Sequence, residues 1–466
     1  MSKLDFTNYL SPFTWRYGSD EMRQIFSEEN KYKIWRKIWV ALARAQNKAG
    51  LVSKEELDDL ENQQGNIDIQ AILENEKETK HDVVAAIHEF ARKAKIGGGK
   101  IHLGATSMDI VDNTDAIRIK DGLEIIEQKA IALLSLFSQK IEQYKDLTCI
   151  GYTHLQPAEP TTVGYRLSVY AQDLLTDYRF LKFIKSQIKG KGMKGAVGTQ
   201  AGYASALEGK NITPEILEKD VMQELGIEAV LISTQVYPRK FDFFALSVLN
   251  SIASTLSKFA ADLRILQSPS IGEWSEPFGE NQVGSSAMPF KKNPINSEKI
   301  CSLARFVSSF PDVALENASL SYLERTLDDS ANKRIIIPEA FLAVDEILRT
   351  SEKLVNGLII NEKKITFNLS QYAPFAATEA ILVEAVKNGA NRQEMHEILK
   401  NISLIAWKEV QEGKINPMSG LLTGNEDIKK YVSEEKIRVF LNVDQHVGTA
   451  PERARQLVSE IKKLTH

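Results

Sequence analysis

A short segment at residues 284–294, GSSAMPFKKNP, joins two adjacent serines to a proline, two lysines and an asparagine. Neither a histidine nor a carboxylate lies within it. A serine that acts as a nucleophile or as a base needs a nearby group that accepts its proton or stabilises its charge. If Ser285 takes part in chemistry, other segments must therefore complete its site. Taken alone, the segment is also typical of a mobile surface turn.

Five further polar clusters interrupt an otherwise helical pattern and carry residue types used in catalysis and anion binding. They are RYGSDEM (16–22), KHDVVAAIH (80–88), IHLGATSMDIVDN (101–113), GYTHLQPAEPTT (151–162) and ERTLDDSANKR (324–334). Histidine is the natural general acid near neutral pH, and arginine forks suit phosphate groups. Each cluster has a structural alternative, because buried histidines, helix caps and surface ion pairs use the same residue types.

These motifs, together with STQVYPRK (233–240), occur in an order that resembles the fumarase/aspartase superfamily of β-eliminating lyases. The segment at 284–294 is similar to the signature loop of that superfamily, and the other motifs narrow the resemblance to the adenylosuccinate lyase family. Any single motif could arise by chance, whereas six or seven in register are hard to obtain otherwise. The resemblance spans almost the whole chain and is weakest in about the last hundred residues.

The resemblance implies elimination of fumarate from a succinylated amine. Removal of a carbon-bound proton leaves a carbanion whose charge spreads onto the neighbouring carboxylate, so the site must hold a dianion. By the resemblance, Ser285 is the base, and Lys291 and Asn293 bind the developing carboxylate. His154 matches the acid that protonates the departing nitrogen, and Glu298 matches the carboxylate that orients this histidine. For His154 alone, a satisfied core histidine is the alternative.

The resemblance also implies a larger set of nucleotide-binding residues. His81 and Asp82 match positions near the phosphate and base of the substrate, and His102, Thr106 and Ser107 match a segment that holds the fumarate-side carboxylate. The remaining matches are the family's phosphate and ribose ligands and a residue that holds a substrate carboxylate or amide: Arg16, Tyr17, Arg325, Ser330, Arg334 and Gln235.

Several of these positions keep structural alternatives. A helix N-terminal charge pair with Lys80 is the alternative for the two residues that follow it. Asp109 and Asp112 lie where a cap for the next long helix is expected. The arginines of the 324–334 cluster are also suited to surface ion pairs with Asp328 and Asp329.

The segments between the clusters predict long helices. Apolar residues recur every three or four positions over 114–146, which predicts one helix of roughly 30 residues, about 45 Å long. Similar patterns cover 161–189, 240–266, 294–310 and 330–356. Most are apolar over more than half their circumference, so we expect them to pack against other chains. Short strands are expected near 148–151 and in the glycine-rich segment 189–205.

The predicted domains are an N-terminal helical domain (1–113), a central long-helix bundle (114–364) that carries the signature loop (276–294), and a C-terminal helical domain (365–466). The resemblance implies an all-α fold whose central five-helix bundle forms a twenty-helix core in a homotetramer. It also implies active sites shared between three chains, which contribute the Ser285 loop, the His154 segment and the Thr106 segment.

Composition excludes several classes of function. The 466 residues include 58 Lys and Arg against 62 Asp and Glu, a net charge of −4, which does not indicate a nucleic-acid or anionic membrane surface. The two cysteines, Cys149 and Cys301, are too few for a disulfide framework. Neither a signal peptide nor an uncharged apolar run of 18 residues is seen, so we expect a soluble, cytoplasmic protein. The resemblance implies no metal or organic cofactor.

Two rival hypotheses stay open. Argininosuccinate lyase, or another superfamily member, shares the signature loop, although the phosphate set around Arg325 and Arg334 argues against it. The rival of another class is a non-catalytic structural homologue. The presence of Ser285, Lys291 and His154 argues against that hypothesis.

Overall fold

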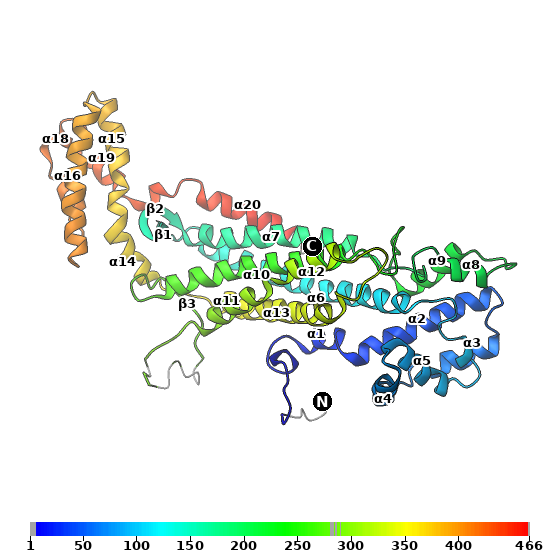
Figure 1. Ribbon diagram of the computed structural model, residues 1–466. Coiled ribbons are helices and arrows are strands. Elements are labelled where there is room, and N and C mark those ends of the chain that lie inside the picture. Colours follow the sequence, from blue (N-terminus) through cyan, green and yellow to red (C-terminus); the bar gives the residue numbers. More distant parts are fainter. Residues whose placement is uncertain (1–5, 280–283, 285–286, 289, 465–466) are drawn as a thin grey trace. The chain divides into compact units, whose positions relative to one another are not determined.

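The computed structural model describes residues 6–279, 284, 287–288 and 290–464, and in this part the chain is mostly helical (Figure 1). The all-α prediction is confirmed. The long helices are α6 (Ser107–Tyr144), α7 (Val163–Gln187), α10 (Lys240–Gln267), α11 (Ile295–Val307) and α13 (Ser330–Asn356). Each coincides with a stretch whose apolar spacing predicts a helix. The start of α6 lies before residue 114, because the polar motif there forms the first turns of the helix instead of a loop.

The chain divides into two compact units. The first comprises residues 1–129, 177–254 and 303–348, and the second comprises residues 130–176, 255–302 and 349–466. Long helices run from one unit into the other, so each unit is built from segments that are distant in sequence. The three sequence-derived domains stay a prediction.

The first unit is built around helix α2. Its shorter elements are η1 (Pro12–Thr14), α1 (Asp20–Ile25), α2 (Glu28–Lys48), α3 (Lys54–Gln63), α4 (Ile69–Thr79), α5 (Asp82–Lys93), η2 (Gly98–Lys100), α8 (Ala201–Ala206), α9 (Pro214–Leu225) and α12 (Phe310–Ser319). Ser27 starts α2 by accepting a hydrogen bond from the Asn30 N–H. The buried face of α2 includes Trp35, Ile38 and Trp39, each worth roughly 1.5–3 kcal/mol when buried. This face packs α2 against its neighbours, which include α3 and α9.

The second unit combines the ends of the long helices with two small antiparallel sheets. Its other elements are β1 (Thr148–Thr153), β2 (Gln156–Thr162), β3 (Trp274–Ser275), β4 (Ile359–Ile360), α14 (Glu362–Tyr372), η3 (Ala373–Phe375), α15 (Ala377–Lys387), α16 (Arg392–Gln411), α17 (Met418–Thr423), α18 (Glu426–Lys429), α19 (Glu434–Phe440), η4 (Val443–His446) and α20 (Ala450–Lys462). Phe259 of α10 packs edge-on against Phe137 of α6 and Tyr170 of α7, with ring centroids 5.4 Å apart in both pairs. These aromatic contacts hold three long helices together within the unit.

The glycine-rich segment 189–205 is not a strand, contrary to the prediction. In the described residues it contains one isolated bridge, and it runs into α8. Gly192, Gly195 and Gly198 have φ values of 86°, 75° and 83°, which glycine adopts readily and which interrupt a strand. The segment forms a loop whose backbone N–H groups are turned toward α6, as described below.

Helix α10 is long and apolar enough to cross a membrane, judged by length and composition alone. Half of its most apolar 18-residue window is buried within the protein, and Leu246, Ile252 and Phe259 are fully buried. The core helix of a soluble protein meets the same criterion.

Candidate active site

The N-terminus of α6 is fixed by the buried carboxylate of Asp109. Its Oδ2 accepts hydrogen bonds from the Thr106 N–H and the Tyr203 hydroxyl, both at 3.0 Å, and its Oδ1 pairs with buried Lys191. Two backbone N–H groups of the glycine-rich segment complete the shell. The cap expected for this position is confirmed, but the carboxylate also ties α6 to that segment. Thr106 and Ser107 therefore stand at a fixed helix N-terminus, which favours negative charge.

Four of the predicted binding residues meet beside this helix end. His81 caps α5, and its Nδ1 accepts a hydrogen bond from the Val84 N–H at 3.5 Å. A neutral ring with this acceptor carries its proton on Nε2, which lies 3.4 Å from Ser107 Oγ. The next residue, Asp82, pairs with Arg334 of α13 at 3.0 Å. His81 is 47% exposed and Arg334 66% exposed, so both can reach a bound molecule.

His102 lies deeper than this group. Its Nδ1 accepts a hydrogen bond from Trp39 Nε1 at 3.1 Å. The pKa of His102 is lowered to about 4, chiefly by burial, which outweighs the opposing effect of Asp109 and is assisted by nearby His81. The ring is therefore uncharged at neutral pH, with its proton on Nε2. A neutral donor next to a helix N-terminus suits a substrate carboxylate.

Arg325 is held by a buried charge network, defined here as Asp112, Arg239, Asp329 and Lys333. Arg325 Nη1 lies 3.2 Å from Asp329 Oδ1, and Asp329 pairs with Arg239 at 2.6 Å. Arg239 in turn pairs with Asp112 of α6 at 3.0 Å, and Lys333 lies 3.8 Å from the same Asp112 carboxylate. The expected Arg325 ion pair exists, but it is anchored in the core instead of on the surface. Asp112 is thus a network member and not merely a cap.

The remaining predicted ligands of the first unit make fewer contacts with the other predicted site residues. The Gln235 N–H donates to the Glu324 carbonyl at 3.2 Å, which sets Gln235 beside the Arg325 segment. Ser330 is the first residue of α13. Arg16 is exposed, with its guanidinium 5.8 Å from the centre of the Tyr17 ring. Among the described residues, no hydrogen bond or ion pair joins Arg16 or Tyr17 to another predicted ligand.

In the second unit, His154 lies at the tip of the β1–β2 hairpin. The strand register leaves His154 and Leu155 as a two-residue turn, with φ values of 53° and 60°. A type I′ turn requires positive φ at both positions, which is costly for residues other than glycine. Both residues are exposed. The alternative of a satisfied core histidine is therefore wrong for this chain, and the strained, exposed position suits a functional group.

The signature loop is tied at its base, although Ser285 itself lies outside the described residues. Gln267, the last residue of α10, bridges the two ends of the loop. Its Oε1 accepts from the Glu276 N–H and its Nε2 donates to the Lys292 carbonyl, both at 2.9 Å. The Glu276 carboxylate accepts hydrogen bonds from backbone N–H groups in the first turn of α11, the shorter at 2.7 Å. The loop therefore leaves and rejoins the helices at fixed points.

Within the loop, Asn293 Nδ2 donates to the Gly284 carbonyl at 3.0 Å. A Cβ atom on Gly284 would overlap the Lys291 carbonyl oxygen, so the close approach of the two loop strands requires glycine there. The Lys291 side chain is exposed. Its cationic head is thus available to an anion, as the sequence predicts.

Glu298 lies on the first turns of α11, where its side chain is 51% exposed. Arg264 Nη2 is 4.0 Å from its carboxylate. Among the described residues of one chain, no ion pair joins Glu298 to His154. Their predicted pairing therefore stays a prediction.

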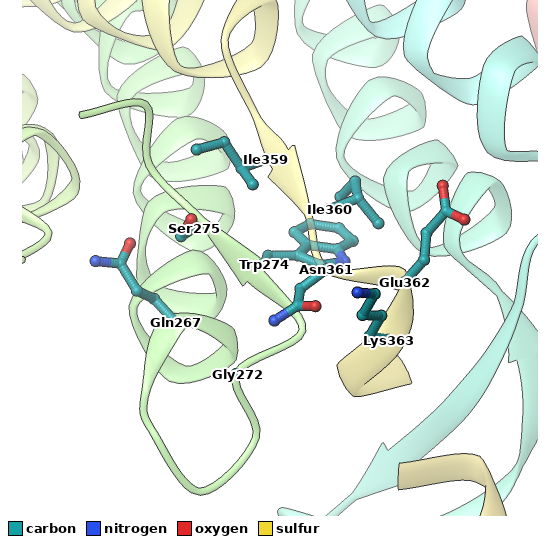
Figure 2. Close-up of a pocket in the computed structure, with 9 residues that line it drawn as sticks. All are labelled: Gln267, Gly272, Trp274, Ser275, Ile359, Ile360, Asn361, Glu362 and Lys363. Carbon is teal, nitrogen blue, oxygen red and sulfur yellow. The ribbon is translucent and has the colours of Figure 1, made fainter. Parts of the chain in front are cut away.

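Two cavities lie away from these residues. One, of about 550 Å³, is lined by β3, β4 and the residues around them, including Gln267, Trp274, Asn361 and Lys363 (Figure 2). The other, of about 870 Å³, is lined by α9 and the end of α7. No predicted site residue lines either cavity.

Comparison with known proteins identifies relatives over nearly the full length. A family model described as "Lyase" matches residues 15–308, and one described as "Adenylosuccinate lyase C-terminus" matches residues 374–457. The adenylosuccinate lyase of Schistosoma mansoni is 39% identical over 87% of this chain and 85% of its own. That of Saccharomyces cerevisiae is 37% identical over 98% and 95%, and that of Archaeoglobus fulgidus is 35% identical over 97% and 99%.

Solved structures share the fold. A 3-carboxy-cis,cis-muconate lactonizing enzyme from Pseudomonas putida superposes with a TM-score of 0.85 at 22% identity, covering 98% of this chain and 99% of that one. A fumarate lyase from Mesorhizobium sp. BNC1 gives 0.83 at 21% identity, covering 97% and 99%. At this level of identity the likeness establishes architecture alone. The sequence matches decide the family: the chain is a lyase and belongs to the adenylosuccinate lyase family.

Proposed function

We propose that the protein catalyses the reversible elimination of fumarate from adenylosuccinate, giving AMP, and from succinylaminoimidazole carboxamide ribotide, giving aminoimidazole carboxamide ribotide (AICAR). In each case one C–N bond breaks, the adjacent carbon loses a proton and the departing nitrogen gains one. The atoms balance without water, an oxidant or a reductant. The reaction needs a base, an acid and anion-binding groups, and it requires neither a metal ion nor an organic cofactor.

In this proposal Ser285 removes the carbon-bound proton. Lys291 and Asn293 hold the carboxylate onto which the negative charge spreads, since preorganised donors act most strongly where charge develops. His154 then protonates the leaving nitrogen, and Glu298 orients that histidine. Splitting the acid and base between two segments lets each face its own side of the scissile bond.

The observation that carries the proposal is the meeting of His81, Asp82, Ser107 and Arg334. These residues come from three helices that are distant in sequence, and all four are matched to substrate contacts. A substrate with a 5′-phosphate and two carboxylates needs cations and helix N-terminal donors close together. The ion pairs that hold Arg325 against the buried charge network support the same role for this residue.

We further propose a cytoplasmic homotetramer whose active sites are each shared between three chains. The exposed positions of His154 and Lys291 support sharing, as does the lack of an ion pair between Glu298 and His154 among the described residues of one chain. One side of α7 also exposes apolar side chains at roughly helical spacing, which are Tyr165, Val169, Phe180 and Phe183. A stripe of this kind is suited to burial against other chains.

Absorbance-monitored turnover of adenylosuccinate tests the function. The wild-type protein should release fumarate, whereas Ser285→Ala and His154→Ala should each lose at least about a hundredfold in kcat. Mixing the two inactive variants under conditions of subunit exchange should restore part of the activity. Turnover of argininosuccinate in place of adenylosuccinate would favour the superfamily rival. Full activity of a dilution-stable monomer would refute shared sites, and absence of turnover on every succinylated substrate would favour the non-catalytic homologue.

A further inference from the structure

A single buried carboxylate joins several segments of the second unit. Glu273 has no exposed surface. Its Oε2 accepts a hydrogen bond from Arg166 Nη1 of α7 at 3.1 Å. Its Oε1 accepts from Asn368 Nδ2 of α14 at 2.9 Å and from the Tyr152 hydroxyl of β1 at 3.4 Å. Its backbone carbonyl accepts from the Asn361 N–H at 2.8 Å. Four segments therefore meet at this residue.

Two of these contacts reach the hairpin that carries His154. Tyr152 lies in β1, two residues before the histidine, and Arg166 also donates to the Ile150 carbonyl of the same strand. Burial raises the pKa of Tyr152, and the charge of Glu273 raises it further. The phenol therefore stays protonated and donates to the carboxylate. Glu273 thus contacts the hairpin stem in two ways. It binds the Tyr152 side chain directly, and through Arg166 it is linked to the backbone carbonyl of Ile150.

Glu273 also lies close in sequence to the start of the signature loop at residue 276. The next two residues form β3, which pairs with β4 (Figure 2). Glu276 follows directly, and it contacts both Gln267 and the first turn of α11. A shift of Glu273 would therefore move the point from which the loop departs.

We propose that Glu273 is a positioning residue that sets both the His154 hairpin and the start of the 276–294 loop. This inference rests on the proposed function, in which those two segments carry the acid and the base. If active sites are shared between chains, the hairpin and loop of one chain serve different sites. The same carboxylate then fixes a catalytic group in each of two sites.

The first test compares two buried carboxylates of the same kind. Glu273→Gln keeps the side-chain shape but turns an amide toward Arg166. A displacement of about 1 Å costs up to roughly 10²-fold in rate, so kcat for adenylosuccinate should fall about 10- to 100-fold. KM should change by less than about threefold, because the nucleotide-binding residues of the first unit are untouched.

Glu89→Gln is the matched control. Glu89 forms a buried ion pair with Arg36 in the first unit, where both side chains are 2% exposed; Arg166, in the pair with Glu273, is 14% exposed. This variant should lose comparable thermal stability, because it also leaves an arginine without its charge partner, while kcat stays within about threefold of wild type. An equal fall in kcat for both variants would assign Glu273 a merely structural role and overturn the proposal.

A double variant separates positioning from folding. Arg166→Gln combined with Glu273→Gln removes both charges, so no uncompensated charge remains buried. Its thermal midpoint should rise above that of Glu273→Gln alone, while kcat stays low. It also provides the test if the single variant does not fold. Recovery of kcat together with stability would contradict a positioning role.

Hydrogen–deuterium exchange gives a readout that does not require activity. In Glu273→Gln, peptides covering 148–162 and 273–279 should exchange faster than in wild type, whereas Glu89→Gln should leave both peptides unchanged. If wild type fails to turn over adenylosuccinate, the proposed function is wrong, and the exchange data still decide whether Glu273 couples the two segments. Faster exchange in one peptide alone, or in neither, would refute the coupling.

Discussion

Two predicted binding residues of the first unit, Ser107 and Arg325, and two predicted catalytic residues of the second, His154 and Lys291, are held in opposite ways. Asp109 and Asp329 are buried, and through them Ser107 and Arg325 are fixed by charges deep in the first unit. His154 instead stands exposed at a hairpin tip, and Lys291 is exposed on a loop that is tied at its base. Burying charge costs desolvation, which ion pairing offsets, and it fixes geometry. Ser107 and Arg325 are therefore preorganised within the chain, whereas His154 and Lys291, which are assigned to chemistry, are presented outward.

Removal of the exposed cation of the loop should have the largest effect. Lys291→Ala should lower kcat about 10²- to 10³-fold, since one preorganised anion-binding donor is lost. Lys292→Ala is the matched control, because the neighbouring ammonium lies 5.3 Å from the centre of the Phe278 ring and has no assigned role. Steady-state kinetics on adenylosuccinate would measure both. Equal losses would show that overall loop charge matters and that the position of Lys291 does not.

A subtler change moves the loop without removing any functional group. Gly284→Ala introduces a methyl group against the Lys291 carbonyl oxygen, so the two loop strands must separate. We expect kcat to fall about 10- to 100-fold through misplacement, with little change in thermal midpoint. Gly65→Ala adds the same methyl group at an exposed turn with no atom within 4 Å and should behave as wild type. If kcat in Gly284→Ala were unchanged, the loop would function even when its two segments are separated at Gly284 and Lys291.

The opposite behaviour is expected in the buried charge network. Asp329→Asn leaves Arg239 and Arg325 without a charged partner, which should raise KM about tenfold with a smaller effect on kcat and cost about 3 kcal/mol of stability. Asp328→Asn, at the adjacent exposed position, is the control. Steady-state kinetics and thermal unfolding distinguish the two. If Asp329→Asn does not fold, Arg325→Gln tests the same effect on KM. A fall in kcat without a change in KM would erase the distinction between the two regions.

The long helices could be predicted from the sequence because apolar spacing is a local signal. The boundaries of α13 agree at both ends, and those of α10 differ by one residue. The start of α6 was missed because its first turns are polar, and their role as a buried anchor depends on Lys191 and Tyr203, far along the chain. The glycine-rich segment is not a strand because three of its glycines adopt positive φ, and the contacts of Gly192 and Gly195 with α6 are tertiary and leave no local signal.

The residues of the candidate site could be predicted from the sequence, but the buried residues that hold them in position could not. Motif resemblance marks His81, Asp82 and Arg334 as ligands, and the structure brings them together. Nothing local marks Glu273, because a buried glutamate before a two-residue strand has no periodicity or spacing to reveal it. The last hundred residues resemble the family least by motif, yet a model of the adenylosuccinate lyase C-terminus matches 374–457. Their helices share a buried core that includes Ile381, and short polar motifs do not capture such a core.

The smallest expected effect concerns stability alone and lies in the first unit. The pKa of His102 is about 4 in the folded protein against about 6.5 in an unfolded chain. Between these values the unfolded chain binds a proton that the folded protein does not, so stability falls as pH drops from about 6.5 toward 4. The loss should be on the order of 2 kcal/mol, discounted for the partial exposure of the ring.

His102→Asn isolates this contribution. Asparagine can keep an acceptor for Trp39 Nε1 and tolerates the φ of 67° at this position. The variant should therefore lose less stability than wild type over the same pH range, as measured by denaturant unfolding at pH 7, 6 and 5. His88→Asn, at an exposed position of α5, should keep the wild-type slope. If His102→Asn also kept that slope, the neutral histidine would not be held by burial, and the claim that the first unit is preorganised from its core would lose one of its supports.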